Sequence, residues 1–338
     1  MSVSEKVTII GDGQMGLVLA DALAWAGVPT TVWGPFPEVV GHLAAHRENP
    51  GRFSGYRLPD SVHVEVDPPL ALEGATLAIN AIPSQFVRPV WTNLASHVPN
   101  GCPIISVAKG VENETLLRPT EVLSASVPSA GATGVLSGPS IARELANHLP
   151  AVLVSASGDE AVANMVRSLF DVPWLRVYTS TDVLGVELAG ACKNVIALAA
   201  GICDGLELGD NAKSAVLARG LAEITRLGLA MGAHASTFAG VAGVGDLATT
   251  CFSPHGRNRS CGEALGRGES LEAYEARVHS VVEGVATTRS VMALAEQWKV
   301  DMPIAQVLNE ILFEGRSPAS GVESLMSRES GRESNQAS

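Results

Sequence analysis

Short β-branched runs alternate with helical patterns along the first half of this chain, and that alternation constrains the fold more than any other feature. Such an alternation is typical of βαβ units and therefore of a mostly parallel sheet. Residues 17–26 form the first predicted helix, and Gly27 closes it where a left-handed cap is favoured. We predict a Rossmann-like, doubly wound α/β sheet. Its candidate strands are 7–10, 30–33, 62–66, 77–80, 104–106, 134–136, 151–155 and 175–179.

The strand pattern stops near residue 182, where Ala/Leu/Gly-rich helical segments take over. A chain of 338 residues also exceeds the usual size of a single hydrophobic core. We predict a sheet domain at 1–182, an all-α C-terminal domain at 183–327 and a disordered polar tail at 328–338. The predicted helices of the second domain are 183–203, 213–231, 261–267, 286–298 and 303–314.

Charge and cysteine content exclude several classes of function. A formal net charge of -12 repels polyanions, so we expect no nucleic-acid partner and no attraction to an anionic membrane. The apolar run 195–202 is interrupted by glycine, so it indicates a buried helix and no membrane insertion. The five cysteines form no CxxC pair and the first ten residues lack a secretion signal, so we expect a cytoplasmic protein without a metal site.

Three glycines follow the first predicted strand and open the first helix. Gly11, Gly13 and Gly16 have the spacing of a dinucleotide fingerprint, in which the backbone approaches a pyrophosphate closely. A glycine turn that only packs is the alternative. Trp33 at the end of the second strand is followed by 34–36, Gly-Pro-Phe, where an acidic residue usually binds the ribose and where no arginine stands either. The choice between NAD and NADP therefore stays open.

Two lysines have positions suited to proton transfer. Lys193 and its neighbour Asn194 lie inside the mostly apolar helical stretch 183–203. A lysine in dry surroundings loses some preference for its ammonium form and can exchange a proton near neutral pH. Lys109 follows the strand 104–106, at the edge where open α/β sheets bind ligands. The alternatives are a snorkelling or salt-bridged Lys193 and a solvated loop Lys109.

Further polar residues gather in loops and in the second half of the chain. Pro83 lies in the loop after the strand 77–80, and Gly138 and Ser140 follow the strand 134–136. Each loop is interpreted either as a ligand contact or as a structural turn. Asp246, Thr250, Arg257 and Asn258 form the densest polar cluster of the second half, in which an arginine fork and an amide could hold a phosphate. A solvated basic loop is the alternative.

Together these segments resemble the soluble NAD(P)-dependent glycerol-3-phosphate dehydrogenase family. The resemblance spans about residues 5 to 315 in the family's order, which makes it far more specific than any single motif. Its segments are GDGQMG (11–16), NAIPSQ (80–85), SVAKGVE (106–112), LSGPSIARE (136–144), ELAGACKNVIALAAGICDGLELGDNAK (187–213), GVGDLATTC (243–251), GRNR (256–259) and VVEGVATT (281–288).

The resemblance implies reversible hydride transfer between NAD(P)H and dihydroxyacetone phosphate, giving sn-glycerol 3-phosphate for glycerophospholipid synthesis. Lys193 would be the acid/base, and Lys109, Asn194, Asp246 and Thr250 would order the proton network. The implied substrate contacts are Lys109, Gly138, Ser140, Arg257 and Asn258. The implied cofactor contacts are Gly11, Gly13, Gln14, Met15, Gly16, Pro83, Lys109, Ala142, Arg257 and Glu283. A homodimer is compatible with the resemblance and with the apolar helical half.

The residues that differ from the family's pattern lie mainly in segments implied to contact the cofactor. Gln14 and Met15 stand where many bacterial members carry serine and tryptophan, and 34–36 replaces a segment that often holds an arginine. His255 and Gly256 precede Arg257, as in eukaryotic members, so one serine contact is not carried over, and His255 is interpreted as a loop residue. Two other functions compete: a reductase of another small hydroxy or keto acid, and a dinucleotide sensor without turnover. A reductase of an unphosphorylated acid would not need Arg257 and Asn258 to hold a phosphate. A sensor without turnover would not need Lys109 and Lys193.

Overall fold

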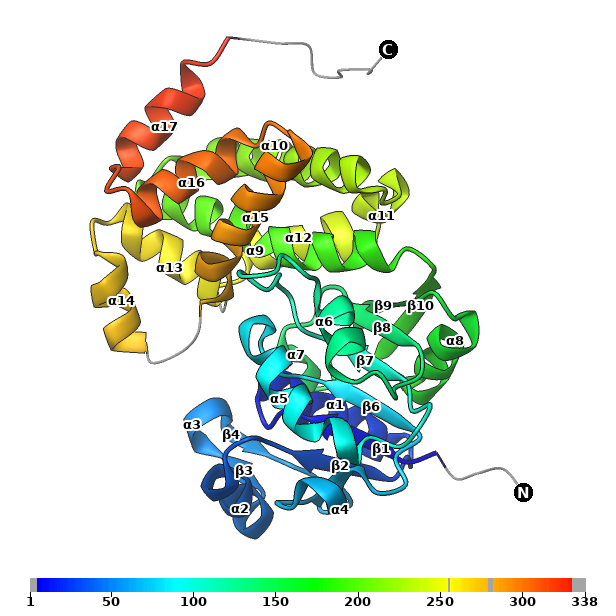
Figure 1. Cartoon of the computed structure of the whole chain (residues 1–338). Coiled ribbons are helices and arrows are strands. Elements are labelled where there is room, and N and C mark those ends of the chain that lie inside the picture. The colour runs from blue at the N-terminus through cyan, green and yellow to red at the C-terminus, as the bar shows by residue number, and fades with distance from the viewer. Residues whose placement is uncertain (1–4, 255, 279–281, 330–338) are drawn as a thin grey trace.

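An eight-stranded sheet forms the first half of the molecule and an all-helical domain the second (Figure 1). The computed structural model describes residues 5–254, 256–278 and 282–329. The sheet order is β10-β9-β8-β7-β6-β1-β2-β5, and every neighbouring pair is parallel except β8 with β9. The predicted fold class is therefore confirmed. The strands are β1 (Val7–Ile10), β2 (Thr30–Trp33), β5 (His63–Val64), β6 (Leu77–Asn80), β7 (Ile104–Ser106), β8 (Thr133–Ser137), β9 (Ala151–Ser157) and β10 (Leu175–Ser180).

Helices cover both faces of the sheet, which explains why the central strands are apolar throughout and do not alternate. All four residues of β1, β2 and β6 are buried. The helices of this domain are α1 (Gln14–Trp25), α2 (Pro37–His46), α3 (Pro50–Phe53), α4 (Pro68–Leu72), α5 (Val87–Leu94), α6 (Pro119–Ser126), α7 (Ala142–Ala146) and α8 (Glu160–Leu169), with the 3-10 turns η1 (Ser84–Phe86) and η2 (Ala95–His97).

Three details of the sheet domain differ from the prediction. The first helix begins at Gln14 and not at residue 17, because Gly13 is its N-cap and the glycine loop itself forms the first turn. The strand expected at 62–66 is only the two residues of β5. A small hairpin, β3 (Glu48–Asn49) with β4 (Ser54–Arg57), was not predicted, because its segment is polar and interrupted by Pro and Gly.

The second domain is built around one buried helix, α9. Its N-cap is Asp182, whose carboxylate accepts a hydrogen bond from Gly185 N at 2.9 Å. Around α9 pack α10, α12, α13, α15 and α16. The helices are α9 (Val183–Gly205), α10 (Gly209–Met231), α11 (Ala235–Ala239), the π-helical turn η3 (Val241–Gly245), α12 (Asp246–Phe252), α13 (Arg257–Gly266), α14 (Leu271–Val278), α15 (Glu283–Trp298), α16 (Pro303–Phe313) and α17 (Pro318–Met326).

By length and composition alone, α9 could cross a membrane, which the shorter run 195–202 did not suggest. Its most apolar window has a mean hydropathy of 1.6, yet 83% of that window is buried inside the protein. The helix is therefore the core of the second domain. Of the predicted tail, Arg328 pairs with Asp301 at 2.9 Å, and residues 330–338 lie outside the described residues.

A buried carboxylate on α9 joins the two domains. Glu187 Oε2 accepts hydrogen bonds from Arg118 Nη1 at 2.6 Å and from Thr120 Oγ1 at 2.7 Å, and its Oε1 accepts one from Thr120 N at 2.9 Å. Burial raises the pKa of Glu187, and the charge of Arg118 opposes that shift. The pair therefore ties the sheet domain to the centre of the helical domain.

The helices α9 and α13 approach each other so closely that their backbones touch. A Cβ on Gly262 would lie 2.0 Å from the carbonyl oxygen of Leu198, a distance that real Cβ atoms do not show. The backbone of a packed helix cannot move aside as a flexible side chain can. The glycine is therefore required by the packing that holds α13 against α9.

We predict that Gly262→Ala lowers the free energy of unfolding by about 1–3 kcal/mol, through overpacking against α9. Urea denaturation of the full chain measures it. The matched control is Gly41→Ala on α2, where a new Cβ meets no atom within 4 Å. The free energy of unfolding of that control should rise by about 0.5–1 kcal/mol, because alanine has a higher helix propensity than glycine. Equal stability of the two variants would contradict the close packing.

Candidate active site

Four loops that carry predicted site residues meet at one edge of the sheet. The strands β1, β6, β7 and β8 are adjacent and parallel, so the loops that leave their carboxyl ends lie together. These loops carry Gly11, Pro83, Lys109 and Gly138, and at Lys109 the edge meets the helical domain through the hydrogen bond to Asp246. The order of strands reverses between β1 and β6, which is where doubly wound sheets bind dinucleotides.

The glycine loop fits a dinucleotide pyrophosphate. Gly11 has a φ of 132°, and a Cβ on Gly16 would lie 2.1 Å from Gly11 O, so the helix packs tightly on the loop. A Cβ on Gly13 would meet no atom within 4 Å, so space is open above the loop. No acidic side chain lies in the first turn of α1, and Gly13 caps it without a side-chain hydrogen bond. The first N–H groups of α1 are therefore available to an anion.

Other predicted cofactor residues lie around this loop. Gln14 is exposed, and its Nε2 donates a hydrogen bond to Arg52 O at 2.8 Å. Met15 shares the lining of a small void of about 10 Å³ with Lys109 and Ser140, so these three residues lie close together. Ala142 is the first residue of α7, which packs against α1.

A carboxylate shared by two lysines forms the centre of the site. Asp246, which is 1% exposed, accepts a hydrogen bond from Lys193 Nζ on Oδ1 at 2.5 Å and from Lys109 Nζ on Oδ2 at 2.7 Å. Thr250, one turn further along α12, accepts from Lys193 Nζ at 2.7 Å and donates to Asp246 O at 2.7 Å. Three segments, the loop after β7 and the helices α9 and α12, thus meet at Asp246.

Counting hydrogen-bond donors separates the roles of the two lysines. An ammonium group has three N–H donors. Lys109 uses all three, on Asp246, Gly138 O at 2.9 Å and Ser140 Oγ at 3.3 Å. Lys193 uses two, on Asp246 and Thr250. Of the two lysines, Lys193 therefore keeps one N–H donor that no described residue accepts.

The surroundings of Lys193 lower its pKa to about 8. Burial is the largest cause, and the positive charge of Lys109 acts in the same direction, while the Asp246 carboxylate opposes both. Asn194, the next residue of α9, donates from Nδ2 to Lys109 O at 3.1 Å and so holds the backbone of the Lys109 loop. The ammonium and amine forms of Lys193 are both accessible near neutral pH.

The predicted phosphate residues begin α13. Arg257 is the first residue of this helix and is exposed, while Asn258 is buried and its Oδ1 accepts a hydrogen bond from Gly284 N at 2.9 Å. That contact leaves the amide NH₂ of Asn258 as a donor. The positive end of α13 and a basic residue in its first turn both favour an anion.

Asn258 and Arg257 lie on the same side of the helical domain as Asn194, the residue after Lys193. A Cβ on Gly284 would lie 2.7 Å from Asn194 O and 2.8 Å from Asn258 Oδ1, so the two asparagines meet at one point. Burial raises the pKa of Glu283, and the charges of Arg257, Lys109 and Lys193 together oppose that rise. The carboxyl group of Glu283 is therefore close enough to feel the charges of Arg257, Lys109 and Lys193. His255 lies outside the described residues.

Sequence reasoning missed one cation at this edge. The segment after β2 contains no arginine, but α3 brings Arg52 to the same place, with its guanidinium 5.4 Å from the centre of the Phe36 ring. The only sequence signal was a polar interval between predicted elements, which does not reveal where a short helix points.

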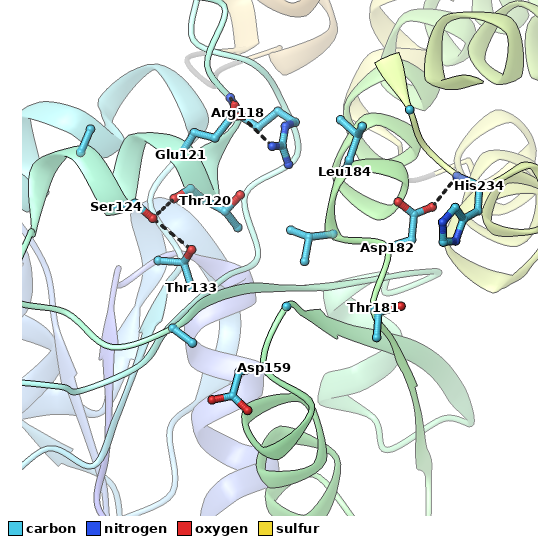
Figure 2. Close-up of a pocket in the computed structure, with 15 residues that line it drawn as sticks. Arg118, Thr120, Glu121, Ser124, Thr133, Asp159, Thr181, Asp182, Leu184 and His234 are labelled. Atoms are coloured by element: carbon cyan, nitrogen blue, oxygen red, sulfur yellow. Dashed lines mark hydrogen bonds and ion pairs between the residues drawn. The ribbon is translucent and has the colours of Figure 1, made fainter. Parts of the chain in front are cut away.

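A separate depression of about 1050 Å³ lies between α6 and the start of α9. Figure 2 shows Arg118, Glu121 and Ser124 on one side of it and Asp182 and His234 on the other. None of the predicted catalytic, substrate or cofactor residues lines it. The predicted site residues therefore lie away from this depression.

A dinucleotide-binding sheet closed by a helical domain that supplies a buried lysine defines a two-domain nicotinamide-dependent dehydrogenase. Residues 6–163 match the profile of the N-terminal domain of NAD-dependent glycerol-3-phosphate dehydrogenases, and residues 182–323 match that of the C-terminal domain. The chain belongs to this family.

Individual relatives agree with the family match. Glycerol-3-phosphate dehydrogenase (NAD(P)+) 2 of Salinibacter ruber is 45% identical over 98% of this chain and 97% of its own length. The Chlorobium limicola enzyme is 41% identical over 97% and 99% of the two chains. The crystal structure of glycerol-3-phosphate dehydrogenase from Coxiella burnetii superposes with a TM-score of 0.92 at 32% identity, covering 96% of this chain and all of that one.

Proposed function

We propose that this protein is an sn-glycerol-3-phosphate dehydrogenase that interconverts dihydroxyacetone phosphate and sn-glycerol 3-phosphate, with Lys193 as the proton donor and acceptor. The observation that carries the proposal is the buried Lys193, which donates to Asp246 and Thr250 and keeps one N–H donor that no described residue accepts. A role in glycerophospholipid synthesis follows from the product. A cytoplasmic location and a homodimer belong to the same proposal.

The cofactor site fits NAD(H) or NADP(H), which when bound supplies or accepts the hydride at C2 of the substrate. The protein's own residues do the rest. In the reductive direction, the ammonium of Lys193 gives its free proton to the developing alkoxide, so that a carbonyl becomes a hydroxyl. In the oxidative direction the neutral amine removes that proton. Asp246 and Thr250 hold the nitrogen in place through both half-reactions.

Lys109 acts mainly by position and charge, because its three donors are already used. It holds Gly138 O and Ser140 Oγ at fixed distances and so shapes the wall of the substrate pocket. Its positive charge also keeps the pKa of Lys193 low. Arg257 and Asn258 would grip the phosphate, which distinguishes this substrate from an unphosphorylated hydroxy or keto acid.

The substrate class is tested by following NADH and NADPH absorbance with dihydroxyacetone phosphate and with dihydroxyacetone. We expect oxidation with the phosphate ester only. Arg257→Ala should raise KM for the ester roughly tenfold to a hundredfold, since a charge-assisted contact contributes about 1.5–3 kcal/mol. Turnover of both substrates at similar kcat/KM would contradict the phosphate assignment, and cofactor binding without turnover would favour a dinucleotide sensor.

Lys193→Met removes the proton donor while keeping an unbranched side chain of similar length. We expect kcat to fall by at least about a hundredfold, as is usual for loss of general acid catalysis, with the cofactor Kd within about threefold of wild type. The rate of turnover is measured by absorbance in single-turnover experiments, and the cofactor Kd is measured by fluorescence titration. A fall in kcat of less than about tenfold would assign the proton transfer to another group.

The pH dependence should follow the lowered pKa of Lys193, about 8. Reduction needs the ammonium form, so its rate should fall as the pH rises through about 8, while oxidation needs the amine and should rise over the same interval. Lys109→Met removes the positive neighbour, so the pKa of Lys193 should rise. The pH at which the rate of reduction falls and the pH at which the rate of oxidation rises should then both increase. If both stay unchanged, Lys109 does not set this pKa.

A further inference from the structure

The end of β2 cannot carry the acidic residue that usually reads the adenosine ribose. A Cβ on Gly34 would lie 2.8 Å from Asp12 Cγ, so the side chain of Asp12 already fills that space. Asp12 comes from the glycine loop itself. The carboxylate near the ribose position is therefore supplied by a different element from the one that usually supplies it.

Asp12 is not available to a ribose hydroxyl. It is 2% exposed, and its Oδ2 accepts a hydrogen bond from Asn49 Nδ2 at 3.3 Å. The same Oδ2 pairs with Arg52 Nε at 3.8 Å. A carboxylate that selects NAD must accept hydrogen bonds from the ribose, whereas this one is buried and its Oδ2 is already engaged by Asn49 and Arg52.

Arg52, in contrast, presents a partly open cation at this place. Its side chain is 41% exposed, and Asp12 engages it only through Nε. The guanidinium lies over the exposed Phe36 ring, and Gln14 Nε2 donates to Arg52 O, so the residue is held against the glycine loop from two sides. No described residue receives a hydrogen bond from its two terminal nitrogens. Those nitrogens form the fork that binds phosphate oxygens in pairs.

The neighbouring arginines of this segment have other partners. Arg47 donates from Nη2 to the carbonyl oxygens of Pro59 and Val62, and Arg57 pairs with Asp60 at 3.2 Å. Figure 1 shows α3 with β3 and β4 beside α2, at the β2 side of the sheet. Among residues 47–57, Arg52 is thus the arginine directed at the glycine loop.

We propose that Arg52 binds the 2′-phosphate of NADP(H), and that this protein consequently prefers NADP(H) to NAD(H). The proposal rests on the dinucleotide site of the proposed function and adds the residue that selects the cofactor. A dianionic phosphate approaching a protein of net charge -12 needs a local cation. Arg52 is pre-positioned by Asp12 and Phe36, so little side-chain freedom is lost when the phosphate binds.

Cofactor binding is measured on the full chain by fluorescence titration with NADPH and NADH, without substrate. For the wild type we expect NADPH to bind at least about tenfold more tightly. In Arg52→Gln the Kd for NADPH should rise roughly tenfold to a hundredfold, the range of a charge-assisted phosphate contact, while the Kd for NADH stays within about threefold. Arg52→Lys keeps the positive charge but loses the guanidinium fork. Its Kd for NADPH should lie between those of the wild type and Arg52→Gln.

The matched control is Arg57→Gln on the same hairpin, which should leave both Kd values unchanged. Adenosine 2′,5′-bisphosphate should compete with NADPH more strongly than 5′-AMP in the wild type but not in Arg52→Gln. The proposal would be overturned if the wild type bound NADPH and NADH with equal affinity. It would also be overturned if Arg52→Gln weakened the binding of both cofactors equally. Selective NADPH binding without turnover of dihydroxyacetone phosphate would refute the proposed function and leave the role of Arg52 standing.

Discussion

The arrangement of the site depends on one buried carboxylate that two ammonium groups share. Lys193 and Lys109 belong to different domains, and Asp246 holds both through its two oxygens. Without that negative charge, two positive groups would be buried together in a poorly solvated place, which is strongly unfavourable. The π-helical turn η3 precedes Asp246 and directs α12 toward the lysines, as such irregular turns often do at functional sites. The carboxylate thus holds the two lysines of the two domains together and balances their charge.

The sequence predicts the parts of this molecule that repeat a simple pattern. Short β-branched runs between helical patterns indicated the central strands, and the change of period near residue 182 indicated the start of α9. The hairpin of β3 and β4 was missed because polar residues with Pro and Gly carry no periodicity. Lys109 and Asp246 are separated by 137 positions, so their pairing could be suggested by family resemblance but not by spacing. Arg52 escaped notice for the same reason, since the fold and not the sequence order brings it to Phe36.

The residues around the glycine loop depend on one another, because Asp12 determines which residue can stand at position 34. Asp12 in the glycine loop leaves no room for a side chain at Gly34, so the usual strand-end acid and this loop acid exclude each other sterically. Asn49 and Arg52 then satisfy the buried Asp12, and the hairpin that carries them packs against the loop. The altered residues of this region therefore form one connected arrangement.

The contact of Glu187 with Arg118 and Thr120 also has a consequence for motion. A hinge motion that separated Arg118 from Glu187 would leave an almost fully buried carboxylate without its cation, which is unfavourable by about 3–5 kcal/mol. Motions of the two domains that keep this contact intact are therefore favoured over motions that break it. Because Glu187 lies near the start of α9, where the two domains join, the contact would act as a fixed point about which the other contacts between the domains rearrange.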